Sequence, residues 1–182
     1  QPARDLEQFI GQHKKIVFIT FGSMTNPEPE QKTRDVLSVL AKKRIPAIIN
    51  TASGGLVKPK IYPRHVYFTE QIPYSYIFPK VYAVIHHGGS GTTHNAIKHG
   101  CASMIIPHIL DQHVWNDIIS RLGLGPKGFP IKKLTTKLFE RRLTQLLENK
   151  TYKHKALEIG KKMHSETDLG IDLAEVLGLA NK

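Results

Sequence analysis

Short runs of consecutive apolar residues alternate along this chain with longer stretches in which apolar residues recur every three or four positions. Unbroken apolar runs are typical of strands buried on both faces, and the three-and-four spacing is typical of helices packed by one face. Alternating strands and helices indicate βαβ units, so we predict an α/β fold with a doubly wound, mostly parallel sheet of about six strands. The apolar runs lie at residues 16–21, 45–50, 66–68, 81–85 and 102–107, and a short irregular run at 125–131 is the sixth expected strand.

The helices expected around these strands have their own start signals. A loop rich in proline and acidic residues at 26–30 opens the first helix, which runs to about Lys43. Residues 4–13 are polar and are interpreted as a linker or the end of a preceding helix, so residues 1–15 are set apart from a domain spanning 16–182. The other helices are expected at residues 92–98, 114–122, 135–148, 152–163 and 168–177.

The most informative segment is residues 81–100, where an apolar strand runs directly into a glycine-rich helix start. Residues 86–91 read His-His-Gly-Gly-Ser-Gly, and the helix follows from Thr92. Unpaired N–H groups at a helix start, aided by the helix dipole, bind phosphate oxygens, and glycine lets a ligand approach the backbone closely. The spacing is neither that of G-x-G-x-x-G nor that of a P-loop. The segment predicts a phosphate cradle, with a tight turn that binds no ligand as the alternative.

A second polar loop follows the next strand along the chain. Residues 102–107 form that strand, and His108, Asp111 and Gln112 come directly after it. The carboxyl ends of parallel strands meet at one edge of a sheet, where open α/β sheets bind their ligands. We therefore expect this loop and residues 86–91 to lie together at one ligand site.

The charge balance narrows the class of ligand. The chain has 26 Lys and Arg against 15 Asp and Glu, a formal net charge of +11, which favours nucleotide phosphates, nucleic acid or an anionic membrane surface. The basic residues are scattered without a nucleic-acid module, so we expect no nucleic-acid partner. No apolar run reaches the ~18 residues of a membrane span, and the single Cys101 fits a reducing compartment. We expect a cytoplasmic protein, and the charge leaves peripheral association with a membrane open.

The ten histidines raise the question of a metal site. His86 and His87 are adjacent at a strand end, where successive side chains diverge. His94 and His99 are five positions apart on a helix, and no Cys or Glu completes a zinc set. We expect neither a bound metal nor a cofactor. A serine hydrolase is disfavoured because the chain lacks a G-x-S-x-G elbow.

Four ordered segments resemble the C-terminal, donor-binding half of the family-one GT-B glycosyltransferases, the UDP-glycosyltransferase superfamily, and the sterol glucosyltransferase branch in particular. The resemblance implies a Rossmann-like domain, and it covers residues 16–177. In sterol enzymes His-Asp-Trp usually follows the Ile/Val-Pro, whereas this chain has Tyr-Ser-Tyr at 74–76. The four segments are FGSM at 21–24, IPYSYIFP at 72–79, HHGGSGTT at 86–93, and 107–112, which ends in Asp-Gln.

The resemblance implies inverting, metal-independent transfer of a hexose from a UDP-sugar, with UDP-glucose favoured, to a hydroxyl of a lipid or small molecule. In this family the base that deprotonates the acceptor lies in the N-terminal, acceptor-binding domain. We therefore expect no catalytic residue in this chain, and no activity without that domain. The start at Gln1 favours an excised piece of a longer enzyme. The alternative is a stand-alone nucleotide-sugar-binding subunit that needs a separate acceptor-binding chain.

The resemblance also assigns donor-binding roles by position. The backbone around Gln71 and Ile72 is expected to hold the nucleobase edge, and His86 to bond the diphosphate. A carboxylate beside a carboxamide offers both acceptors and donors, so Asp111 and Gln112 are expected to grip the sugar hydroxyls. Many relatives use an acidic residue for the ribose, and Asn95 is the expected substitute. The remaining expected contacts are Gly22 and Ser23 in the first loop, and Gly88, Ser90, Gly91 and Thr92 in the cradle.

Overall fold

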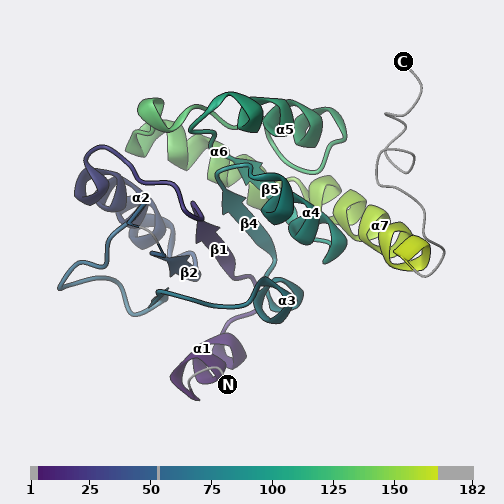
Figure 1. The fold of residues 1–182 in the computed structure, drawn as a ribbon. Coiled ribbons are helices and arrows are strands. Elements are labelled where there is room, and N and C mark those ends of the chain that lie inside the picture. Colours follow the sequence, from purple (N-terminus) through teal and green to yellow (C-terminus); the bar gives the residue numbers. More distant parts are fainter. Residues whose placement is uncertain (1–3, 53, 168–182) are drawn as a thin grey trace.

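The computed structural model describes residues 4–52 and 54–167 and contains a five-stranded, all-parallel sheet with the strand order β3-β2-β1-β4-β5 (Figure 1). Four of the strands are buried at every residue, because helices cover both faces, whereas the edge strand β3 alternates between buried and half-buried residues. The strands are β1 (Val17–Thr20), β2 (Ala47–Asn50), β3 (Val66–Thr69), β4 (Ala83–His86) and β5 (Ala102–Ile105).

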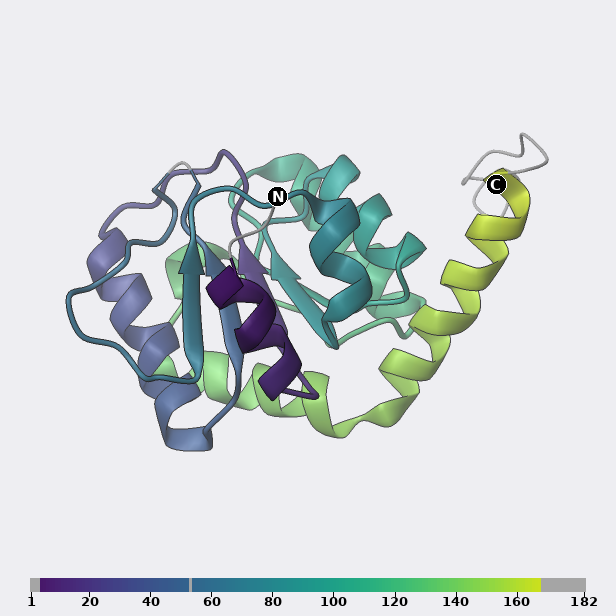
Figure 2. The ribbon, with the colours of Figure 1, turned by 90° about the horizontal axis from the view of Figure 1, so that it is seen from below.

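Helices cover the sheet on both sides (Figures 1 and 2). Val17 and Ile19 of β1 pack in the cluster that holds the apolar residues of α2 and α6. Phe18, between them, points to the opposite face and packs with α1, α3 and α4. A third cluster joins α4, α5 and α7 beside β5. The helices are α1 (Arg4–Gln12), α2 (Pro29–Lys43), α3 (Tyr74–Ile77), α4 (Ser90–Lys98), α5 (Leu110–Arg121), α6 (Thr136–Glu148) and α7 (Lys150–Thr167), with short 3-10 turns η1 (Phe78–Lys80) and η2 (Ile131–Lys133).

The polar segment at the start of the described chain is the helix α1, and it packs against the sheet. Leu6 and Phe9 are buried in the same cluster as Phe18 of β1. Tyr67 of β3 donates a hydrogen bond from its hydroxyl to Asp5 Oδ2 at 3.1 Å. Residues expected to form a linker or the end of a helix therefore contribute to one face of the core.

The predicted sixth strand does not form within the part of the chain that the structure describes. Residues 124–131 run beside β5, where Ser103 N–H donates to the Leu124 carbonyl at 2.9 Å. Gly125 lies so close to the Ser103 carbonyl that a Cβ there would overlap it, and the same holds for Gly128 and the Ile105 carbonyl. Prolines at 126 and 130 carry no N–H to donate, so a regular ladder cannot form.

Two helix boundaries differ from those expected, and one helix is not described. α5 begins at Leu110 and not at residue 114, because Gln112 Oε1 accepts the backbone N–H groups of His108 at 2.7 Å and Ile109 at 3.3 Å. A Gln at the third helical position commonly satisfies the start of a helix in this way. α7 extends to Thr167. The helix expected at 168–177 lies outside the described residues.

Candidate functional site

The ends of the parallel strands form a row of polar side chains at the carboxyl edge of the sheet. The pairing register places Thr20 of β1 beside Asn50 of β2 on one side and His86 of β4 on the other. The helices after β1 and β4 lie on opposite faces, so these neighbouring strands mark the topological switch point, where such sheets bind ligands. Thr20 and His86 are fully buried, and Asn50 is 7% exposed.

A glycine turn carries the chain from β4 into α4. Gly88 has φ +98°, and a Cβ there would lie 2.7 Å from Ile105 Cγ2. The N-cap residue Gly89 is extended and provides no side-chain cap. The first hydrogen bond inside the helix runs from Thr93 N–H to the Gly89 carbonyl at 2.9 Å, so the N–H groups of residues 90–92 have no acceptor within the helix. Ser90 and Gly91 are exposed, and a Cβ added at Gly91 would meet nothing within 4 Å, so no other part of the described chain packs against Gly91 at this helix start.

The His87 ring fills the space between this turn and the turn after β1. A Cβ added at Gly22 would lie 2.7 Å from His87 Cε1, and one added at Gly89 would lie 2.5 Å from His87 Nε2. Gly22 has φ +59°, and its N–H donates to Thr20 Oγ1 at 3.2 Å. Because Gly22 and Gly89 have no side chains, the His87 ring can pack between the turn after β1 and the turn after β4.

Three imidazoles at this edge each have a buried nitrogen with no hydrogen-bond partner among residues 4–52 and 54–167: His86 Nε2, His87 Nδ1 and His108 Nε2. Gly88 N–H donates to His86 Nδ1 at 3.2 Å, so the proton of the neutral His86 ring is on Nε2, where it can donate. Burial, followed by the neighbouring His87, lowers the pKa of His86 to about 3. Burial also lowers the pKa of His87 and lowers that of His108 to about 4. At neutral pH the site therefore offers uncharged imidazoles.

The start of α5 borders the glycine turn. Asp111 is exposed, and its negative charge is near enough to His87 to counter part of the lowering of that pKa. Gln112 is 2% exposed and lies under Gly88, whose added Cβ would be 3.2 Å from Gln112 Cβ. Gln112 Oε1 is occupied by the backbone at the helix start. Asp111 is therefore open to solvent at the site, whereas Gln112 mainly supports its floor.

A pocket of about 490 Å³ opens where β2 and β3 end. Tyr74 connects this pocket to β1, because its hydroxyl lies 3.4 Å from Thr20 Oγ1. Thr20 Oγ1 also accepts a hydrogen bond from the Gly22 N–H, so polar contacts link the pocket to the turn after β1. The residues that line the pocket are Asn50, Ala52, Glu70, Gln71, Ile72, Pro73 and Tyr74.

The structure gathers most of the predicted site residues along this edge. Ser23 and Ser90 are exposed, and Thr92 is buried in the first turn of α4. The Asn95 amide donates to the Gly91 carbonyl at 2.9 Å within its own helix, and its expected contact with the ribose stays a prediction. Those beside the glycine turns are Gly22, Ser23, His86, Gly88, Ser90, Gly91, Thr92, Asp111 and Gln112, while Gln71 and Ile72 line the pocket.

No individual ligand contact was assigned from the sequence to His87, His108, Glu70 or Tyr74, although His87 and His108 lie in the segments expected at the site. The position of His87, directly before two glycines, was a usable signal, because only a neighbour without a side chain leaves room for a ring against the turn. No local signal identified Tyr74, whose role depends on contact with a strand 54 positions away.

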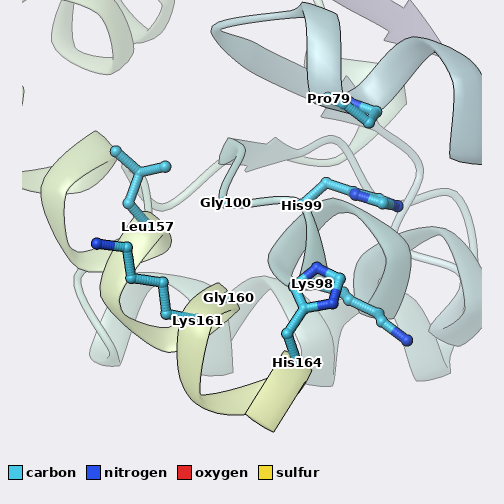
Figure 3. Close-up of a pocket in the computed structure, with 8 residues that line it drawn as sticks. All are labelled: Pro79, Lys98, His99, Gly100, Leu157, Gly160, Lys161 and His164. Carbon is cyan, nitrogen blue, oxygen red and sulfur yellow. The ribbon is translucent and has the colours of Figure 1, made fainter. Parts of the chain in front are cut away.

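A second cavity, of about 250 Å³, lies between the C-terminal end of α4 and α7 (Figure 3). It is lined by basic side chains, and the rings of His99 and His164 are 5.9 Å apart. Figure 3 shows Lys98 and Lys161 pointing in opposite directions. The last carbonyls of a helix disfavour an anion, so this cavity is a poorer phosphate site than the N-terminal end of α4.

Within residues 4–52 and 54–167, no three His, Cys, Asp or Glu side chains gather as metal ligands would. No helix there has the length and apolar content needed to cross a membrane.

Comparisons with known proteins agree on one type of domain. Residues 41–170 match the family described as "Erythromycin biosynthesis protein CIII-like, C-terminal domain". The sterol 3-beta-glucosyltransferase UGT80A2 of Arabidopsis thaliana is 31% identical over 166 residues, which are 91% of this chain and 26% of that protein. The chain spans about a quarter of the length of the two Arabidopsis relatives and 13–14% of the length of the fungal relatives it matches.

Solved structures show the same arrangement of strands and helices. A UDP-glucose: anthocyanidin 3-O-glucosyltransferase in complex with UDP has a TM-score of 0.76 at 16% identity, covering 98% of this chain and 42% of that one. The glycosyltransferase SnogD from Streptomyces nogalater has a TM-score of 0.66 at 25% identity, covering 83% of this chain and 39% of that one.

Proposed function

We propose that this chain binds the UDP-sugar donor of an inverting, metal-independent glycosyltransferase. The chain belongs to the erythromycin biosynthesis protein CIII-like C-terminal domain family of GT-B glycosyltransferases. UDP-glucose is the first candidate. The observation that carries the proposal is the open helix start at residues 90–92, with neutral buried imidazoles beside it at the switch point of the sheet.

In this proposal the diphosphate lies at the N-terminal end of α4. The departing nucleoside diphosphate gains negative charge, and N–H donors that are already in place stabilise it without reorganisation. His86 Nε2–H is an uncharged donor that has no acceptor within the described protein, and a phosphate oxygen would satisfy it. His87, between the two glycine turns, is positioned to hold the cradle or to bond the phosphate itself.

The nucleobase is assigned to the pocket at Gln71 and Ile72. The contact between Tyr74 and Thr20 joins this pocket to the cradle, so one extended ligand can span both. Asp111, which is exposed beside the glycine turn, is assigned to the sugar hydroxyls. Gln112 is assigned a supporting role there, since its side-chain oxygen is engaged by the backbone.

Transfer itself is proposed for the longer protein that carries an acceptor-binding part. Curated relatives are named sterol 3-beta-glucosyltransferases, which supports a lipid or small-molecule hydroxyl as acceptor. The base is assigned to the acceptor-binding part, outside this chain. The alternative is a separate acceptor-binding subunit. A cytoplasmic location, peripheral to a membrane, accords with the net charge of +11. Burial raises the pKa of the Cys101 thiol to about 11, so this thiol is not a reactive nucleophile.

The first prediction concerns the donor. We expect UDP and UDP-glucose to bind the chain with a Kd of roughly 10 µM to 1 mM, because a separate acceptor half would contribute the other wall of the cleft. Isothermal calorimetry with and without EDTA measures this, and EDTA should change nothing. A lack of binding at millimolar UDP, or a strict requirement for Mg²⁺, would contradict the proposal.

The second prediction separates sugar from nucleotide. Asp111→Ala should weaken UDP-glucose binding by about 1.5–3 kcal/mol, the range for hydrogen bonds to a charged group, and leave UDP binding unchanged. The same titrations measure both ligands. Asp117→Ala removes another carboxylate from α5, one that pairs with Lys127 at 2.7 Å, and serves as the matched control. Equal affinities for UDP-glucose in the Asp111→Ala protein and its parent would remove Asp111 from the sugar site.

A further inference from the structure

The described residues of the connection from β2 to β3, 51–52 and 54–65, form no helix, unlike the connections that follow β1, β4 and β5. It is a long loop, and residues 57–65, which we call the basic loop, form its second half. In Figures 1 and 2 this blue segment swings out beyond α2 at the side of the sheet and returns at the amino end of β3. The basic loop thus leads back to the edge opposite the carboxyl ends that carry the candidate site.

The basic loop is fixed at both ends and near its tip. Val57 N–H donates to Thr33 Oγ1 of α2 at 3.0 Å, and His65 Nε2 donates to the Leu40 carbonyl at 3.0 Å. The Tyr62 ring packs edge-on against Phe68 of β3 at 4.9 Å. Prolines at 59 and 63 restrict the backbone on either side of the tip. The conformation of the loop is therefore held by the rest of the fold.

This fixed loop presents a large apolar side chain to solvent. Ile61 is 89% exposed, although its neighbour Tyr62 is partly buried. Leu110 of α5 is equally exposed, but it is followed by the acidic Asp111 and lies beside the candidate donor site. Ile61, unlike Leu110, is not adjacent in sequence to a proposed donor contact; the nearest such contacts along the chain are Gln71 and Ile72.

The surroundings of Ile61 are cationic. Lys58, Lys60 and Arg64 are exposed around it, and the sequence contains no Asp or Glu from residue 54 to residue 69. The Leu40 carbonyl that accepts His65 also accepts the Ile45 N–H, so the loop meets the end of α2, where Arg44 is exposed. Lys42 and Lys43 nearby share Glu140. The basic loop therefore presents one exposed apolar side chain, Ile61, with three exposed cations within three positions of it along the chain.

From this arrangement we infer that the basic loop docks the protein on an anionic lipid surface, with Ile61 inserted among the acyl chains and Lys58, Lys60 and Arg64 at the headgroups. An apolar side chain gains from leaving water, and each cation gains from the negative surface potential. A nucleic acid would use the cations but offers no apolar layer for Ile61. The inference does not require the proposed transferase function, and its test uses no donor or acceptor.

Vesicle sedimentation tests the inference on the chain itself. We expect binding to phosphatidylcholine vesicles with about 30% phosphatidylserine, little binding to phosphatidylcholine alone, and weakening as salt is raised. Ile61→Ser should reduce the partition coefficient at least about tenfold, from the loss of a buried aliphatic side chain. Lys58→Gln with Lys60→Gln should reduce it about 25-fold, since each charge contributes about fivefold.

Two matched controls keep the result specific. Leu110→Ser removes an apolar side chain of the same 89% exposure and should leave vesicle binding unchanged. Lys132→Gln with Lys133→Gln removes two exposed charges elsewhere and should have a much smaller effect than the loop pair. Circular dichroism confirms that each variant is folded.

Several outcomes would overturn the inference. Equal binding to both kinds of vesicle, or an unchanged partition of the Ile61→Ser protein, would remove the basic loop as the docking site. Equal losses from the two lysine pairs would show that net charge alone is responsible. Binding to RNA that the loop lysine pair weakens and Ile61→Ser does not, combined with no binding to anionic vesicles, would identify a nucleic-acid surface instead.

Discussion

Gly88→Ala is expected to lower the free energy of unfolding by about 3 kcal/mol and to abolish measurable UDP binding. Gly88 has φ +98°, a conformation that costs an L-residue about 1–2 kcal/mol. The new methyl group would also lie 2.7 Å from Ile105 Cγ2 and 3.2 Å from Gln112 Cβ, and overpacking of this kind costs about 1–3 kcal/mol. Relief of the clash would move the β4–α4 turn, and the proposed phosphate donors move with it. Urea unfolding and UDP titration measure the two effects.

Gly91→Ala is the matched control, three residues further along the same segment. Its added Cβ would meet nothing within 4 Å, and the residue lies in the first turn of α4. Ala is favoured over Gly in helices by about 0.5–1 kcal/mol, so stability should stay the same or rise. If Gly91→Ala destabilised the protein as much as Gly88→Ala, the special backbone of Gly88 would not be the cause.

Acid is expected to destabilise the protein through His86. In the unfolded chain a histidine binds a proton near pH 6.5, whereas burial lowers the pKa of folded His86 to about 3. Between these values the unfolded state holds the extra proton, so stability rises with pH and falls as the pH drops below about 6.5. From pH 6.5 to 5 the loss attributable to His86 is about 1.6 kcal/mol, because the slope reaches about 1.36 kcal/mol per pH unit only once the unfolded-state histidine is fully protonated. His87 and His108, whose pKa values are also lowered, act in the same direction.

Urea unfolding at several pH values measures the slope of stability against pH. His86→Asn removes the titrating group and keeps an acceptor for the Gly88 N–H, so its slope should be shallower than that of the parent between about pH 5 and 6.5. His154→Gln, at an exposed position of α7, is the control. Identical slopes for the His86→Asn protein and its parent would contradict a neutral, buried His86.

Local sequence signals were sufficient for most elements of the fold. Unbroken apolar runs identified all five observed strands. Four of them are buried at every residue and so show no polar alternation, whereas the run at 66–68 marked the edge strand β3. The doubly wound, parallel architecture and the family are confirmed. The glycine-rich start of α4 was also predicted, because two consecutive glycines, Gly88 and Gly89, are a local signal of a backbone turn. The assignment of ligand contacts to individual site residues stays a prediction.

Contacts between distant segments decided the rest. The expected sixth strand fails because Gly125 and Gly128 press against β5 carbonyls while the neighbouring prolines cannot donate, and only the packed sheet shows this. The segment expected to be a linker or a helix end is a helix that contributes to the core, because Leu6 and Phe9 pack against an apolar face of the sheet.

The site divides in the same way between sequence and structure. The sequence by itself determined which residues lie at the strand ends, because the positions of those ends follow from the local alternation of strand, turn and helix. Only the tertiary structure decided that His87 lies between Gly22 and Gly89, and that Tyr74 links the β2–β3 pocket to Thr20. Side-chain direction and the meeting of turns 65 positions apart depend on packing of the whole sheet, which no local pattern encodes.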